Sequence, residues 1–121
     1  MKEKMHPIDL SYALKATDGD LELLREVLEA FLEEYPTQLA QMEAALSAGD
    51  NSVVQRASHT IKGTLRLFGN VPSRAIAETL EQMGASGSLE NATESYESLK
   101  MSLATLRLQL LDAMKNINLY D

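Results

Sequence analysis

Apolar residues recur at steps of three and four along most of the chain, which is the spacing of an amphipathic helix. The first long stripe consists of Leu21, Leu24, Leu28, Phe31, Leu32, Tyr35, Leu39, Met42 and Leu46. Asp20 is a good N-cap for this helix, and the run 47–51 supplies its end and the cap of the next one. Pro36 lies inside the stripe and is expected to kink or divide the helix, because proline removes a backbone donor.

Two shorter helices are predicted in the middle of the chain. The first runs from about Ser52 to Phe68 and ends at the break Gly69-Asn70. Pro72 suits the first turn of the second helix, which is expected to stop at Gly84. The segment 84–87 would then be the most flexible interior loop.

The last helix is predicted to begin with Ser88 as its cap, and a short helix over about 10–16 precedes the whole set. The apolar stripe of the last helix is close to a heptad pattern and consists of Leu89, Ala92, Tyr96, Leu99, Leu103, Leu106, Leu110, Ala113 and Ile117. No segment alternates as a strand would. The predicted fold is therefore all-α: an up-down-up-down antiparallel four-helix bundle with a short extra N-terminal helix. Bundle packing accounts for the heptad-like stripe, so we expect a monomer.

The length of 121 residues favours one domain over residues 1–121, with an ordered core over about 8–115 and fraying ends, including a tail from Asn116. The chain has no cysteine, which excludes disulfides, thiolate metal sites and cysteine catalysis. No apolar run is long enough for a membrane span. These features predict a soluble, cytoplasmic protein.

The charge is distributed unevenly. The formal net charge is −7, which disfavours binding to nucleic acid. Between Asp50 and Glu78, however, there is no acidic residue, and this window carries the four cations Arg56, Lys62, Arg66 and Arg74. A local cationic surface on an acidic protein indicates an anionic group or partner at this place.

On a helical wheel of the segment 52–68, His59 falls almost opposite the apolar face and therefore points to solvent. An exposed imidazole can act as a nucleophile. Its neighbours on the same face are Ser52, Gln55, Arg56, Lys62, Gly63 and Arg66. Lys62 is one turn onward and could reach an anion on the ring. Glycine destabilises a helix by about 1 kcal/mol relative to alanine. The one structural advantage of Gly63 is therefore the empty space that it leaves beside His59.

The string His59-Thr60-Ile61-Lys62-Gly63, with Gly69 ten residues after the histidine, resembles the motif of histidine-containing phosphotransfer (HPt) domains of bacterial phosphorelays. The segment 31–36, with Asp50 and Leu80-Glu81, fits the same family, so that the resemblance covers nearly the whole chain. It implies a four-helix bundle whose active histidine is exposed in the middle of a helix.

The resemblance also implies roles for individual residues. His59 would accept a phosphoryl group from the phosphoaspartate of a receiver domain and pass it to another receiver. Lys62 would neighbour the phosphate, Gly63 would give the receiver clearance, and Gly69 would end the helix as a turn. The helical wheel, rather than the resemblance, adds Arg66, Gln55 and Arg56 as further supporting positions around the site.

The chain departs from the family pattern at two positions. Arg66 stands where the family often has a small residue, and it would narrow access or add a contact to phosphate or receiver. Glu81 stands where some members carry a glutamine that bonds the ring, and Gln82 follows it. Glu81 and Gln82 are therefore the two candidate ring partners.

The predicted function is that of a phosphoryl carrier without its own kinase activity, since no Gly-rich nucleotide loop is present. The expected partners are receiver domains, a hybrid histidine kinase, or both; nucleic acid and membrane are not expected. We predict no cofactor and no metal on this chain, because the receiver would supply the metal ion. The alternative is a non-phosphorylated helical-bundle adaptor that docks onto a receiver or kinase. A hydrolase using His59 is disfavoured, because no serine or carboxylate partners the ring on this helix face.

Overall fold

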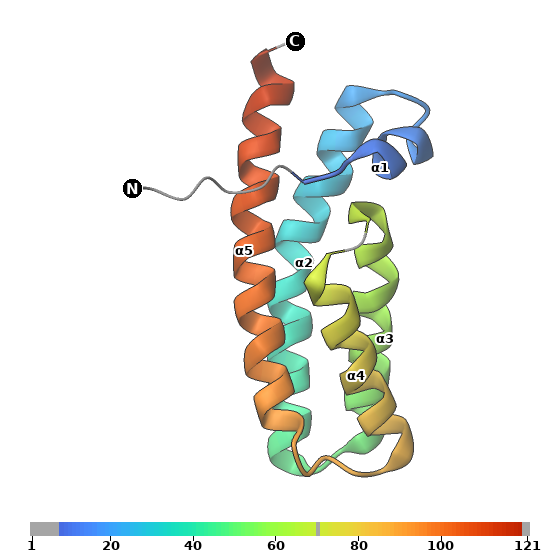
Figure 1. The fold of residues 1–121 in the computed structure, drawn as a ribbon, viewed down its shortest axis with the longest axis vertical. Helices are drawn as coiled ribbons and strands as arrows, with labels where there is room; N and C mark the ends of the chain where they lie inside the picture. The colour runs from blue at the N-terminus through green and yellow to red at the C-terminus, as the bar shows by residue number, and fades with distance from the viewer. Residues whose placement is uncertain (1–7, 70, 120–121) are drawn as a thin grey trace.

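The computed structural model describes residues 8–69 and 71–119. Its elements are α1 (Ser11–Ala16), α2 (Leu21–Ala48), α3 (Asn51–Leu65), the 3-10 turn η1 (Arg66–Phe68), α4 (Pro72–Ser86) and α5 (Ala92–Leu119). The long helices α2 to α5 run alternately down and up beside one another, and α1 lies across one end of the bundle (Figure 1). The described residues contain no strand. The predicted all-α, up-down-up-down fold with an extra N-terminal helix is confirmed.

Two of the predicted N-caps, Asp20 and Asp50, hold the starts of their helices. The carboxylate of Asp20 accepts a hydrogen bond from the Leu23 amide at 3.1 Å, and that of Asp50 accepts one from the Val53 amide at 3.2 Å. Between these two helices the chain turns at Gly49, whose φ of 68° is the left-handed conformation that glycine adopts without strain. α2 and α3 therefore begin where the sequence predicts.

The core is formed by the apolar stripes of the four long helices. Phe31 stacks on Tyr35 with the ring centroids 5.3 Å apart and meets Phe68 edge-on at 5.0 Å, which joins α2 to η1. The buried residues of α5 are Ala92, Tyr96, Leu99, Leu103, Leu106, Leu110 and Met114. Most of the predicted stripe thus faces the core, as bundle packing requires, with Met114 buried in place of Ala113.

Of the two outcomes predicted for Pro36, a kink or a division of the helix, the division is wrong, because α2 continues as one helix through the proline. Proline fixes φ near its helical value and removes only one backbone hydrogen bond. On either side, Tyr35 and Leu39 are buried in the core. Packing on both flanks therefore keeps the helix continuous.

The predicted end of α4 at Gly84 is also wrong, and 84–86 is helical rather than a flexible loop. The helix ends at Gly87 in the left-handed conformation, with φ of 78°. Gly84 has a different use: a Cβ there would lie 2.7 Å from the Gln55 backbone nitrogen and 2.8 Å from the Asn51 carbonyl oxygen. The glycine therefore permits α4 to pack closely against the backbone of α3.

Ser88 does not cap the last helix, which begins only at Ala92. The Ser88 amide instead donates to the Met83 carbonyl at 3.2 Å and so completes the end of α4. Leu89 lies in the loop that follows and packs against the core from there. At the other end, α5 extends to Leu119 and so includes four residues of the tail predicted to fray. The N-terminal residues predicted to fray lie outside the described residues.

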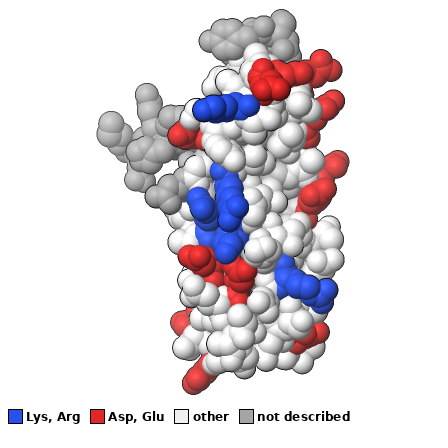
Figure 2. Space-filling model, turned by 90° about the vertical axis from the view of Figure 1, so that its right-hand side faces the viewer, with Lys and Arg blue, Asp and Glu red and all other residues white. Residues whose placement is uncertain are grey.

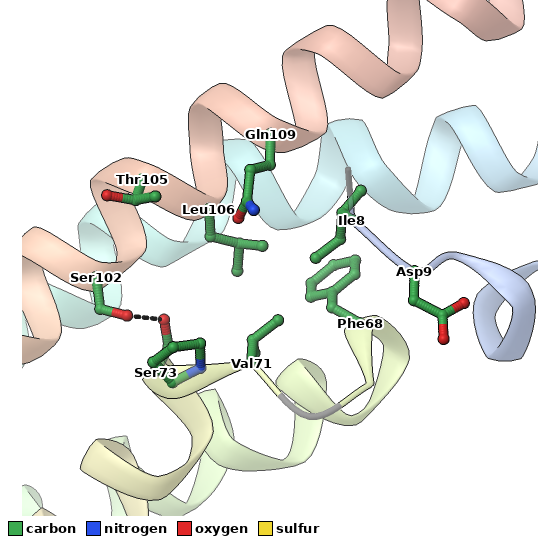
Figure 3. A pocket seen from close by; sticks show the side chains of 10 residues that line it. Ile8, Asp9, Phe68, Val71, Ser73, Ser102, Thr105, Leu106 and Gln109 are labelled. Atoms are coloured by element: carbon green, nitrogen blue, oxygen red, sulfur yellow. Dashed lines mark hydrogen bonds between the residues drawn. The ribbon is translucent and has the colours of Figure 1, made fainter. Parts of the chain in front are cut away.

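The connection between α3 and α4 is made by η1 and Gly69, whose φ of 75° and ψ of −145° favour glycine. Next to this connection lies a largely apolar cavity between α5, the start of α4 and the N-terminal segment (Figure 3). Ile8, Phe68 and Leu106 point into it, and the hydroxyls of Ser73 and Ser102 hydrogen-bond at 2.7 Å on its rim. No predicted site residue lines this cavity.

The Gly84→Ala variant is expected to be less stable than wild type by about 1–3 kcal/mol, because the added methyl group forces two backbones apart. Gly63→Ala is the matched control, since a Cβ at this position meets nothing within 4 Å. It should stabilise the helix by up to about 1 kcal/mol. Urea unfolding followed by circular dichroism measures both. Equal stability of Gly84→Ala and wild type would contradict the close packing of α3 and α4.

Candidate functional site

His59 lies on the outer face of α3. The opposite face of this helix packs against the rest of the bundle through buried residues that include Val54, Ile61 and Leu65. The His59 side chain is consequently 68% exposed, as the helical wheel predicts.

Glu81 of α4 reaches this ring. One of its carboxylate oxygens, Oε2, lies 2.6 Å from His59 Nδ1, and the other, Oε1, lies 2.5 Å from Lys62 Nζ. The Glu81 side chain is only 17% exposed. Gly84 lies one helical turn after Glu81, so the close approach that it permits brings this carboxylate within reach of α3. A single side chain of α4 thus links two residues of α3.

The proton on the ring follows from the charge of this carboxylate. The hydrogen bond from Lys62 lowers the pKa of Glu81 below its usual value; burial raises it, and the hydrogen bond from His59 lowers it further. Glu81 is therefore ionised at neutral pH, and an ionised carboxylate only accepts hydrogen bonds. Nδ1 must then carry the ring proton, which leaves the lone pair on Nε2. No described residue hydrogen-bonds to Nε2.

The charge of Lys62 is largely paired inside the protein. Besides Glu81, its ammonium lies 3.9 Å from Glu78 Oε1, and its side chain is 18% exposed. The cationic surface that the sequence predicts is thus a mixed one. Figure 2 shows this face of α3 and α4, with a group of basic side chains directly above a group of acidic ones.

The other predicted site residues surround this centre. Gly63 leaves open space, since nothing lies within 4 Å of a Cβ built there. Arg66 is exposed in η1 and borders a shallow depression with Lys62 and Arg74. Arg56 lies on another flank of α3, in a groove shared with α2.

The remaining two predicted site residues, Gln55 and Gln82, lie at the edges of the site. Gln55 is exposed on α3, and its backbone faces Gly84. Gln82 is exposed on α4, and no hydrogen bond from it to His59 is found among the described residues. Of the two candidate ring partners, the structure therefore brings only Glu81 to the ring.

Sequence reasoning did not assign Glu78 or Gly84 to the site. Glu78 is the first acid after the cationic window and lies one turn before Glu81, so its helical spacing could have been used to find it. The sequence pattern at Gly84 was misleading, because a glycine near the end of a helix usually marks the point where the helix ends. Only the packing of α4 on α3 distinguishes the two uses.

Over residues 8–69 and 71–119, no group of three or more His, Asp or Glu side chains is placed to hold a metal ion. In the same part of the chain, no helix combines the length and the apolar character that a membrane span requires.

The fold and the site together define a helical bundle that presents one oriented histidine to solvent. The sequence profile of the Hpt domain family matches residues 26–116, and the chain belongs to this family. The crystal structure of histidine-containing phosphotransfer protein B (HptB) from Pseudomonas aeruginosa PAO1 superposes with a TM-score of 0.83 at 20% identity, covering 93% of this chain and 98% of that chain. At this identity the similarity shows the fold. A search of curated proteins found no match.

Family membership carries a general function. Proteins with this domain are phosphocarriers rather than kinases, and they act with receiver domains and kinases in phosphorelays. The chain is accordingly a histidine phosphotransfer protein of a phosphorelay.

The bridge from Glu81 to His59 and Lys62 is expected to make stability depend on pH. Because the pKa of folded Glu81 lies below its usual value of 4.5, its contribution is complete above pH 4.5 and is lost as the pH falls through the folded-state pKa. Glu81→Gln should therefore be less stable than wild type at pH 7, and the difference should shrink towards pH 3. Urea unfolding of both proteins at the two pH values measures this. A difference that does not change with pH would contradict an ionic role for Glu81.

Proposed function

We propose that Nε2 of His59 accepts a phosphoryl group from the aspartyl phosphate of one receiver domain and donates it to the aspartate of a second. The observation that carries this proposal is the hydrogen bond between Glu81 and Nδ1, because it leaves the Nε2 lone pair directed away from α4. The 68% exposure of the side chain supports it, since a receiver must approach the ring closely.

The transfer is balanced as an in-line displacement at phosphorus. The Nε2 lone pair forms the N–P bond while the P–O bond to the receiver aspartate breaks, and the aspartate leaves as a carboxylate. The proton stays on Nδ1, so the phosphorylated ring carries positive charge, which the Glu81 carboxylate stabilises across 2.6 Å. Transfer to the second receiver is the reverse reaction. The metal ion that assists it would belong to the receiver.

The neighbouring residues have separate roles in this proposal. Lys62 would offset negative charge that arrives with the phosphoryl group, once a contact with phosphate competes with its pairing to Glu81. Gly63 would leave room for the receiver, because an added side chain would project into the open space beside the ring. Gln55 and Arg56 would contact the receiver at the edges of the site.

Intact-mass analysis of the purified chain after treatment with phosphoramidate, a small phosphoryl donor, tests the proposal first. One acid-labile phosphoryl group is expected. The loaded protein is then mixed with purified receiver domains, and movement of the label to a receiver is expected. Incubation with ATP alone should give no label, since the proposal assigns the chain no kinase activity. Binding to a receiver without any transfer would instead favour the adaptor.

A further inference from the structure

The arrangement of charged side chains changes along the face that α3 and α4 share. The two helices are antiparallel, so His59 lies level with Glu81, and Lys62 lies level with Glu78 and Glu81. Beyond these pairs, Arg66 and Arg74 border a shallow depression whose lining also includes Lys62 and Glu78. The acidic and basic groups of this face in Figure 2 follow the same order. The face thus has a paired region around the ring, and next to it a depression in which the three cations Lys62, Arg66 and Arg74 outnumber the single carboxylate of Glu78.

Arg66 and Arg74 differ from Lys62 in having no carboxylate partner. Lys62 bonds to Glu81 and lies near Glu78, whereas neither arginine forms an ion pair or a side-chain hydrogen bond with any described residue. Arg66 is exposed and Arg74 is half-buried at the wall of the depression. Two like charges side by side slightly destabilise the free protein. An anionic group that enters the depression would relieve this repulsion and bond to both guanidinium groups.

The net negative charge of the whole protein indicates that an acidic partner would contact only this part of the surface. With a net charge of −7, the protein as a whole repels an acidic partner. The depression therefore favours one orientation, in which the acidic groups of the partner lie at the arginines and not elsewhere. Arg66 follows His59 by seven residues, which places it about 10 Å along the helix axis from the ring. This separation is too long for a purely local role in the chemistry at Nε2 and is suitable for recognition.

We propose that Arg66 and Arg74 form a specificity site for carboxylate side chains on the surface of the partner receiver domain, about 10 Å from its phosphorylated aspartate. This inference rests on the proposed function, because it concerns the partner with which His59 exchanges the phosphoryl group. It assigns Arg66 to binding of the receiver rather than to the phosphoryl group. Receivers that carry acidic side chains at that distance would be accepted, and receivers with basic ones would be rejected.

The test compares wild type with Arg66→Gln, Arg74→Gln and the double variant. Arg107→Gln is the matched control, because it removes the same charge from an exposed position on α5. All proteins are first loaded with phosphoramidate, and equal loading is expected. Each loaded protein is then mixed with a panel of purified receiver domains, and the initial rate of transfer is measured at low and high salt.

Transfer from wild type should fall as salt rises, because screening weakens the contact. The double variant should transfer at least about fivefold more slowly at low salt and should lose most of the salt dependence. Arg107→Gln should match wild type. Equal rates and equal salt dependence for the double variant and wild type would overturn the inference. If wild type fails to load, or transfers to no receiver, the proposed function itself fails.

Discussion

His59→Ala is expected to abolish phosphoryl acceptance while leaving the bundle folded. The ring supplies the nucleophilic nitrogen, and no other described residue on this face carries an imidazole. The loss should therefore be complete rather than partial. Stability should change little, because the side chain is 68% exposed and its removal leaves Glu81 still paired with Lys62.

Acid-labile label after phosphoramidate treatment, measured by intact mass, checks this expectation, and circular dichroism confirms that the variant is helical. His6→Ala is the control for chemical labelling, since His6 is the other of the two histidines of the chain. It should load as wild type does. If His59→Ala retained the acid-labile group and His6→Ala lost it, the assignment of the acceptor to His59 would be refuted.

Glu81→Ala is expected to slow phosphoryl acceptance by roughly ten- to hundredfold, the loss that is typical when the hydrogen-bond partner that orients a metal-binding histidine is removed. Without the carboxylate, Nδ1 loses the acceptor that holds its proton, so the proton can move to Nε2 and block the nucleophile. The positive charge of the phosphorylated ring also loses its partner, 2.6 Å away. Lys62 is freed at the same time, which adds a cation near the ring without restoring the orientation.

Glu81→Gln separates these two effects. The glutamine oxygen can still accept from Nδ1, whereas the negative charge is lost. This variant should therefore recover much of the rate that Glu81→Ala loses. Nitrogen-15 NMR of the ring should show the proton mainly on Nδ1 in wild type and Glu81→Gln, and shifted towards Nε2 in Glu81→Ala. An unchanged tautomer together with an unchanged loading rate in Glu81→Ala would show that the contact has no part in the reaction.

The Glu81 contact has a consequence for the design of the site. An ionised carboxylate that binds both the ring and Lys62 offsets the positive charge of the lysine until a phosphoryl group arrives. A neutral amide at this position would leave the lysine free. The site therefore has no uncompensated lysine charge beside the ring, but the ring is held in one defined tautomer. Its unpaired positive charge lies farther along the face, at Arg66 and Arg74.

Much of the fold was predictable from local pattern. The period of the apolar residues located all four long helices, and Asp20 and Asp50 located two of their starts. The same period placed His59 on the outer face, because the direction of a side chain on a helix depends only on its position in the turn. The errors fell at Pro36, Gly84 and Ser88, where the local preference of a residue competes with packing.

The amino-acid sequence was sufficient for the four-helix architecture and the exposed histidine, since both follow from spacing within single helices. The family followed from the resemblance of its motifs to those of HPt domains. The side chain that contacts the ring could be identified only from the packing of α4 on α3. The contact of Glu81 with His59 joins two helices and depends on their separation and register. Both depend on Gly84, where a missing Cβ lets two backbones approach. A contact between helices is a property of packing, and no periodicity along one helix contains it.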